Sequence, residues 1–276
     1  MKISINSIQV NLSRAVGPAV AGWVLAQFGA GAAFLSSGFA YFPMALVLIF
    51  AQPRPLPAVP HEGTLRAIRA GVRAVMENRS LGIPVLTVAV VSFFGSGIQP
   101  LTAGIASDLY GVDALGFGWL VSSMGISCAV SGVIIALIGE RIARSRSTLV
   151  GFFFYASGIL LVGATDLYSV GLSAFVLIGV GHVFVYVSSA TSLQIHLSEG
   201  LRGRVTSLYM MAIFVAMPAG AQLGGLLGDR VGLPVVLFGY GIALLAYALF
   251  GAVVLRGFSD MDGEPLQEHP LQDGSR

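Results

Sequence analysis

Residues 207–221 read SLYMMAIFVAMPAGA, and residues 7–21, which lie 200 positions earlier, read SIQVNLSRAVGPAVA. The two segments share a serine at their start and the same proline and alanines near their end. After a slip of three residues the similarity continues between 29–46 and 232–249, where two glycines, two alanines and a leucine match. Self-similarity at a long period in a hydrophobic chain indicates a helical bundle built from two related halves. Because equivalent helix pairs stand at opposite ends, we expect the first half to lack helices at its start.

The composition places the chain in a membrane. It is 55% hydrophobic and 10% charged, with a mean hydropathy of +0.85, whereas a soluble domain carries about 25% charged residues. Many of the 36 glycines lie inside apolar runs, where they let membrane helices approach closely. The formal net charge of +2 is too small to indicate a nucleic-acid partner. The sequence therefore predicts an all-α, polytopic membrane protein.

Eight apolar stretches are long enough to span a bilayer, which takes about 20 helical residues. We expect these spans at 4–27, 31–51, 83–106, 114–139, 147–165, 168–192, 204–228 and 233–255. Glycine-containing segments such as 110–113 and 229–232 are the expected turns between them.

The arginines predict the orientation of these spans. Connections on one side carry Arg54, Arg66, Arg69, Arg73, Arg79, Arg141, Arg144, Arg146, Arg202 and Arg204. The connections on the other side carry only Arg230. Since basic residues concentrate in cytoplasmic loops, both termini are expected in the cytoplasm, with the spans in the plasma membrane.

Three motifs resemble the major facilitator superfamily of transporters. The run GPAVAG at 17–22 is similar to the end of the antiporter motif in the fifth helix, which points to Gly17, Pro18 and Gly22. The run ALIGERIAR at 136–144 resembles the cytoplasmic loop motif of each half, although it has Glu140 where an aspartate is usual. Gln194 followed by LRGRV at 201–205 is similar to the signature of the enterobactin-exporter and macrolide-efflux branch, the transmembrane secretion effector type.

The resemblance implies that the spans are helices five to twelve of a twelve-helix fold. Residues 1–51 are then the last two helices of the N-terminal bundle, and 83–256 form the six-helix C-terminal bundle. Between them, 52–82 is a central cytoplasmic loop, with a proline-rich start and an amphipathic helix whose basic face lies on the anionic leaflet or meets a partner. Residues 257–276 are expected to form a disordered acidic tail.

The implied function is proton-coupled export of a small amphipathic compound such as a drug or a siderophore. Such transporters rock two six-helix bundles about a central cavity, and four helices of the first bundle are not found in this sequence. The alternative is therefore a non-transporting truncated remnant or an accessory membrane protein.

Polar residues inside the spans are the candidates for the cavity, because each is costly in lipid unless paired or facing water. The candidates are Asn11, Arg14, Ser96, Gln99, His182, Tyr186 and Ser189. In the resembling family the helices that carry the last five line the cavity. Arg14 is either a cavity charge or a structural ion-pair partner. Imidazole ordinarily titrates near neutral pH, so His182 is either a proton carrier or a packing residue.

Two further clusters have two interpretations each. Residues 209–217 contain three methionines, Tyr209 and Phe214, which either form an adaptable apolar wall for bulky substrates or pack within the bundle. The family match implies that Glu140, Arg141 and Arg144 form a cytoplasmic latch, with the acid near a neighbouring helix N-terminus. The alternative is an ordinary positive-inside loop.

Several enzyme classes are excluded by absent motifs. The sequence has one lysine, Lys2, and hence no Walker A motif for nucleotide hydrolysis. It also has no zinc-protease motif and no serine-hydrolase nucleophile motif. We therefore expect no enzyme activity, no cofactor and no metal site, and as partners a small-molecule substrate, protons and the lipid bilayer.

Overall fold

The computed structural model describes residues 28, 32, 35–36, 38–47, 49–50, 64–197, 199–254 and 256–263. Within these residues, six helices are long and apolar enough to cross a membrane. They are Arg79–Leu109, Ala114–Ile138, Arg144–Ala164, Tyr168–His196, Leu201–Val231 and Leu233–Val253. Each lies close to one of the last six expected spans, and the all-α class is confirmed. The first expected span, 4–27, lies outside the described residues, and a short apolar helix, Gly38–Val47, falls within the second.

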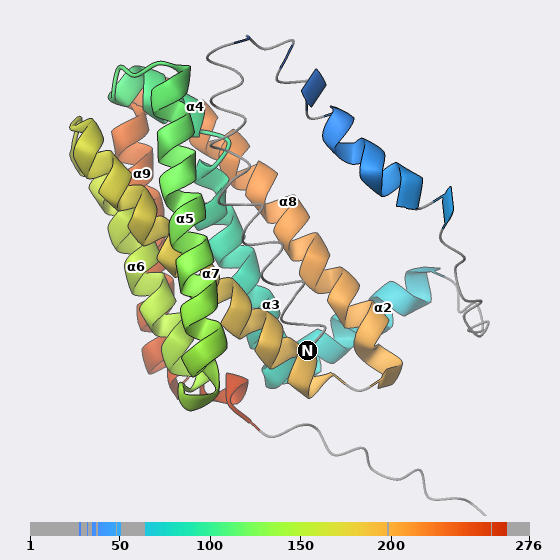
Figure 1. Ribbon diagram of the computed structural model, residues 1–276. Helices are drawn as coiled ribbons and strands as arrows, with labels where there is room; N and C mark the ends of the chain where they lie inside the picture. Colours follow the sequence, from blue (N-terminus) through green and yellow to red (C-terminus); the bar gives the residue numbers. More distant parts are fainter. Residues whose placement is uncertain are drawn as a thin grey trace, which may run out of the picture.

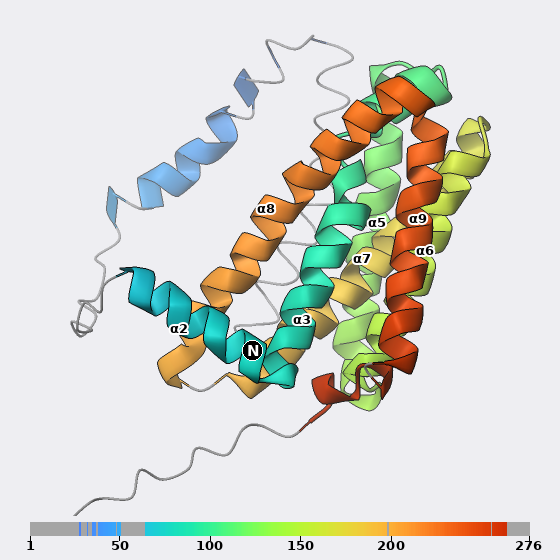
Figure 2. The ribbon, with the colours of Figure 1, turned by 180° about the vertical axis from the view of Figure 1, so that it is seen from behind.

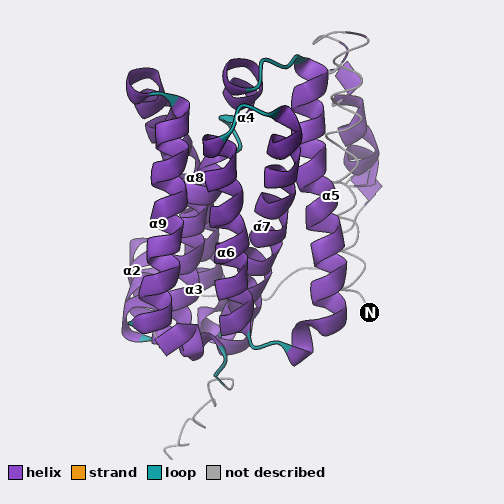
Figure 3. Ribbon diagram, turned by 90° about the vertical axis from the view of Figure 1, so that its left-hand side faces the viewer, coloured by secondary structure: helices purple, strands orange, loops and turns teal. Residues whose placement is uncertain are grey.

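The described part of the chain is helical throughout, without a strand (Figure 3). The main helices are α2 (Thr64–Glu77), α3 (Arg79–Val90), α5 (Ala114–Ile138), α6 (Arg144–Ala164), α7 (Tyr168–His196), α8 (Glu199–Val231) and α9 (Leu233–Val253). Four short helical segments continue the span that begins with α3: η1 (Val91–Gly95), η2 (Ser96–Ile98), α4 (Thr102–Gly104) and η3 (Ile105–Leu109). Two more, η4 (Gly139–Arg141) and η5 (Arg256–Met261), follow α5 and α9.

The six spans form one bundle in which consecutive spans run antiparallel (Figures 1 and 2). Helix α6 packs most extensively against α7 and α9, while α5 packs against α7. Helix α3 contacts both α7 and α8, so it joins the two sides of the bundle. The start of α3, the end of α5 and the start of α6 therefore meet at one end, which carries Arg79, Arg141, Arg144, Arg146, Arg202 and Arg204.

Close approach of α6 and α7 builds the core. Tyr155 on α6 and Ile178 on α7 are fully buried there. A Cβ atom at Gly181 of α7 would lie 2.5 Å from the Tyr155 nitrogen and 2.6 Å from the Gly151 oxygen. Only glycine fits at that position, and its small size lets the two backbones touch, as small residues do in membrane bundles.

Helix α3 is continued by irregular turns through the middle of the bundle. Pro84 lies inside α3, and η1 is a π-helical turn that is followed directly by the 3-10 turn η2. Single π turns frequently occur at functional sites. Here they place Ser92 and Ser96 on the side of the span that faces α7, as the hydrogen bonds described below require.

The turns at Gly111 and Gly232, at the end of the bundle opposite the arginine-bearing one, form as the sequence predicts. Asp113 caps α5, because its carboxylate accepts hydrogen bonds from the N–H groups of Leu115 and Gly116 at 3.1 and 3.0 Å. Gly111 and Gly232 have φ angles of 61° and 90°, a left-handed region that glycine enters without strain.

The amphipathic helix expected between 52 and 82 is present as α2. It packs against α8 (Figure 2), with Gly71 facing Leu208 and Arg204. On its exposed face Arg73 forms an ion pair with Glu77 at 2.7 Å, and this hydrogen bond raises the pKa of Arg73. Its position on a lipid leaflet stays a prediction.

The expected boundary of the disordered tail at Gly257 is wrong for residues 257–263. The chain turns back at η5, and Phe258 and Met261 are fully buried. Phe258 stacks on Phe152 with ring centroids 6.4 Å apart. Apolar burial of these two side chains outweighs the acidic composition of the segment. Residues 264–276 lie outside the described part.

Candidate functional site

A cavity of about 520 Å³ lies between η2, α5, α7 and α8, and we call it the central cavity. Its lining consists of Ser96, Gln99, Val121, Met124, Gly125, Cys128, His182, Tyr186, Met210, Ile213, Phe214 and Met217. Four of the seven candidate cavity residues are thus brought together in space: Ser96, Gln99, His182 and Tyr186.

A hydrogen-bond network fixes Tyr186 at the edge of this cavity. Its hydroxyl lies 2.6 Å from the Ser92 hydroxyl and 3.0 Å from the Ser96 hydroxyl. Ser96 also contacts the hydroxyl of the buried Tyr155 at 3.3 Å. Because η1 presents Ser92 and η2 presents Ser96 to one phenol, these two turns are connected to α7 by polar contacts inside an otherwise apolar bundle.

His182 stacks on Tyr186 one helical turn away. The two ring centroids are 4.3 Å apart at an interplanar angle of 32°, and the centroid of the Tyr155 ring lies 6.2 Å from that of His182. His182 is 9% exposed and lines the cavity. It therefore lies at the cavity wall with two tyrosine rings nearby.

Helix α8 supplies an apolar wall opposite this network. Met210, Phe214 and Met217 line the cavity, whereas Tyr209 is buried in the core and Met211 is exposed and does not line the cavity. Thioether side chains are unbranched and polarisable, so such a wall adapts to ligands of different shape.

Sequence reasoning missed the contribution of α5. Val121, Met124, Gly125 and Cys128 recur at spacings of three, one and three residues, which places them on one helical face. The sulfur of Cys128 contacts the Gly179 carbonyl at 3.4 Å, so this face meets α7. The spacing was visible in the sequence, but small and apolar residues gave no chemical signal.

The other candidate cavity residues lie elsewhere. Ser189 is fully buried and does not line the cavity, and its hydroxyl has no hydrogen-bond partner among the described residues. Asn11 and Arg14, together with Gly17, Pro18 and Gly22 of the antiporter-like motif, lie outside the described residues.

The central cavity is uncharged where the structure describes it. None of its lining residues is an aspartate, glutamate, lysine or arginine. The described residues also contain no cluster of three His, Cys, Asp or Glu side chains that could hold a metal ion. The described wall therefore suits a ligand bound by apolar contacts and a few hydrogen bonds.

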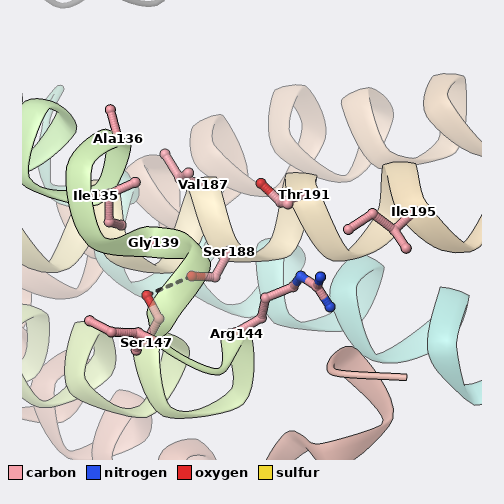
Figure 4. Close-up of a pocket in the computed structure, with 10 residues that line it drawn as sticks. Ile135, Ala136, Gly139, Arg144, Ser147, Val187, Ser188, Thr191 and Ile195 are labelled. Atoms are coloured by element: carbon pink, nitrogen blue, oxygen red, sulfur yellow. Dashed lines mark hydrogen bonds between the residues drawn. The ribbon is translucent and has the colours of Figure 1, made fainter. Parts of the chain in front are cut away.

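A second hollow of about 440 Å³ lies at the arginine-bearing end, and we call it the outer groove (Figure 4). It is lined by Ile135, Ala136, Gly139, Ile142, Arg144, Ser147, Val187, Ser188, Thr191 and Ile195. At its floor Ser188 donates a hydrogen bond of 2.7 Å to Ser147, which ties α7 to α6. Apart from Arg144, the lining is apolar or carries hydroxyl groups.

The residues proposed for a latch have contacts that the sequence did not indicate. Arg144 is the first residue of α6, and its Nη1 donates a hydrogen bond of 3.1 Å to the Met261 carbonyl. The acid at the α6 N-terminus is Asp262, which accepts a hydrogen bond of 3.0 Å from the Ser145 N–H. Arg141 is exposed in η4, and the Glu140 side chain lies outside the described part.

Among solved structures, the chain resembles a bacterial homolog of the human lysosomal transporter Spinster, in an inward-facing and unoccupied conformation. The TM-score is 0.60 at 15% identity, and the match covers 89% of this chain and 64% of that one. This likeness defines the class: the bundle has the fold of a multi-helix membrane transporter.

The sequence comparisons give the family. The profile of the transmembrane secretion effector family matches residues 2–273, so the chain belongs to this family of major facilitator transporters. The staphyloferrin A transporter of Staphylococcus aureus is 23% identical over 243 residues, which cover 84% of this chain and 58% of that protein. The multi-drug resistance efflux pump PmrA of Streptococcus pneumoniae is 23% identical over 244 residues, which cover 87% of this chain and 60% of the pump. The chain thus spans about three fifths of the length of these relatives.

Proposed function

We propose that this chain exports a small amphipathic compound by secondary active transport, with the central cavity as its C-terminal substrate wall. One observation carries the proposal. Four polar side chains lie on one side of the central cavity, opposite the apolar wall of α8. They are Ser96 and Gln99 from the span that begins with α3, and His182 and Tyr186 from α7. Hydrogen-bonding groups on one side and adaptable apolar groups on the other match an amphipathic ligand.

The described cavity wall favours substrates that are neutral or weakly charged in the part it contacts. A permanently charged ligand needs an opposite charge or water when it leaves bulk solvent, and the described lining carries no formal charge apart from a titratable histidine. The names of two relatives refer to staphyloferrin A and to drugs. The substrate class that we propose for this chain is amphipathic small molecules in general.

Proton coupling is proposed to use His182. Imidazole is the side chain whose ordinary pKa lies near neutral pH, and His182 is in aromatic contact with Tyr186 in the same wall. A change of charge on His182 would alter the hydrogen-bonded position of Tyr186, and with it the contact of η1 and η2 with α7.

The proposed location is the bacterial plasma membrane with the arginine-bearing end in the cytoplasm. Arg141, Arg146 and Arg202 stand at that end and are exposed, and the positive-inside rule favours this orientation. Both termini are then proposed to be cytoplasmic. The latch of Glu140, Arg141 and Arg144 stays a prediction.

The test is flux in proteoliposomes that contain the 276-residue chain under an imposed pH gradient. We expect gradient-dependent movement of a fluorescent amphipathic dye, abolished by His182→Gln and reduced by Tyr186→Phe. Ser173→Ala is the matched control, because Ser173 is exposed on the same helix and does not line the cavity. Dye that binds in the cavity without any flux would favour the non-transporting alternative.

A further inference from the structure

We propose that the outer groove is a binding site for an anionic glycerophospholipid, with Arg144 as the headgroup ligand. This goes beyond the transport function and does not depend on it, since it needs only that the bundle lies in a bilayer. The observation behind it is a single guanidinium at the end of an otherwise uncharged groove (Figure 4).

The groove is separate from the central cavity. His182 and Thr191 are nine residues apart on α7, and at about 100° per residue their side chains leave the helix in opposite directions. His182 lines the central cavity, whereas Thr191 lines the outer groove and is exposed. A ligand in the outer groove therefore contacts the outside of the bundle and not the substrate wall.

The depth of Arg144 suits a lipid headgroup. Arg144 begins the span Arg144–Ala164, so it lies where the hydrocarbon core meets the headgroup region. From this level the uncharged lining follows α7 from Ile195 to Val187, which is about 12 Å at a rise of 1.5 Å per residue. The charged end and the apolar length match the two parts of a phospholipid.

The guanidinium has donors to spare for a phosphate. One Nη1 hydrogen is given to the Met261 carbonyl, and Arg144 forms no ion pair with any carboxylate that the structure describes. The nearby acid, Asp262, is engaged with Ser145 at the helix N-terminus instead. Because arginine carries five N–H donors, a phosphate can be bound in addition to the Met261 contact.

The neighbouring charges strengthen the preference for an anion. Arg141 and Arg146 are exposed beside Arg144 at the same end of the bundle. Basic pockets between membrane helices favour anionic headgroups. Thr191 adds a hydroxyl without a partner among the described residues, which can donate to an ester oxygen of the lipid.

The experiment uses native mass spectrometry of the purified 276-residue chain. It compares phosphatidylglycerol, phosphatidylcholine and diacylglycerol with identical acyl chains. We expect one phosphatidylglycerol to be retained in preference to the other two. Arg144→Gln should lower its affinity about tenfold, the loss of a charge-assisted contact, and Arg144→Lys should recover part of it.

Two further variants separate the groove from general surface charge. Arg146→Gln removes an exposed arginine that does not line the groove, and its lipid binding should match the unmodified chain. Thr191→Trp fills the groove and leaves Arg144 in place, so it should lower retention of all three lipids. Inorganic phosphate should not displace the bound lipid.

Three outcomes would overturn the proposal. The first is an equal loss of lipid binding in Arg144→Gln and Arg146→Gln, and the second is undiminished phosphatidylglycerol binding in Thr191→Trp. The third is a dimer of the chain that forms instead of a lipid adduct and that is abolished by Thr191→Trp. A thermal melt without added lipid shows whether each variant is folded, and Thr191→Trp tests the site even if Arg144→Gln is unstable.

Discussion

The Asp262 carboxylate accepts a hydrogen bond of 3.0 Å from the backbone N–H of Ser145, 117 residues earlier in the chain. It also accepts one from the Ser145 hydroxyl. The segment after the last span therefore caps the first turn of α6, a role that is usually taken by the residue directly before a helix. Here that residue is Ala143, which has no side-chain acceptor.

Asp262→Ala should destabilise the bundle by about 1 kcal/mol, the ordinary cost of a lost N-terminal cap. The measurement is thermal unfolding in detergent, followed by circular dichroism. Asp260→Ala is the control, because Asp260 lies in the same segment and forms no side-chain hydrogen bond with the described residues. Equal effects of the two variants would show that the cap contributes nothing.

Phe258→Ala should cost about 3–5 kcal/mol, since it removes a fully buried aromatic side chain. The ring stacks on Phe152 and lies 5.9 Å from Tyr247, so its loss opens a cavity between α6 and α9. Truncation after residue 257 should destabilise the bundle at least as much, and truncation after residue 263 should not. An unchanged melting temperature in Phe258→Ala would contradict the packing of this segment.

Gly181→Ala should destabilise the contact between α6 and α7 and lower the yield of folded protein. A Cβ atom there meets backbone atoms of Tyr155 and Gly151 that cannot move independently of their helix. Gly239→Ala is the matched control inside α9, because an added Cβ meets nothing within 4 Å. It should be neutral or slightly stabilising, as alanine favours helix more than glycine. Similar melting temperatures for both variants would argue against the close approach.

Ser92→Ala should release the Tyr186 hydroxyl from its shortest contact, at 2.6 Å. We expect a loss of about 1 kcal/mol of stability. We also expect faster labelling of Cys128, the single cysteine of the chain, because the cavity wall becomes less fixed. Labelling is followed by mass spectrometry with a small thiol reagent. Ser157→Ala, on α6 and away from the cavity lining, should leave the rate unchanged.

Tyr110 should make stability fall at alkaline pH. Burial raises its pKa to about 12, above the ordinary value of about 10 for tyrosine. The neutral phenol is thus favoured in the folded state, and its contribution is complete below pH 10 and lost between about pH 10 and 12. Tyr110→Phe should remove this alkaline loss without lowering stability at neutral pH, because the hydroxyl has no partner among the described residues.

Tyr168→Phe is the contrasting variant, and it should lower stability by about 1 kcal/mol at neutral pH, since it loses a 2.9 Å hydrogen bond to the Gly116 carbonyl.

The amino-acid sequence by itself determined the class, six of the spans and the turns between them. The length of an apolar run and the φ preference of glycine are local properties, so Gly111 and Gly232 could be placed at turns without knowledge of the packing. The family could be inferred from motifs because each motif is a short contiguous run. Ser96, Gln99, His182 and Tyr186 were found because polar side chains are rare in spans and need a reason.

Only the tertiary structure decided which helical faces meet. Cys128 and Ser189 look alike to a helical-period argument, yet one lines the cavity and the other is buried away from it. The same holds for Phe258 and Asp262, whose sequence reads as a polar tail although they pack on α6. A period of 3.6 residues gives the direction of a side chain from its own helix axis. It does not say which helix lies in that direction, because that depends on contacts between residues far apart in the chain, such as Cys128 with Gly179 and Ser145 with Asp262.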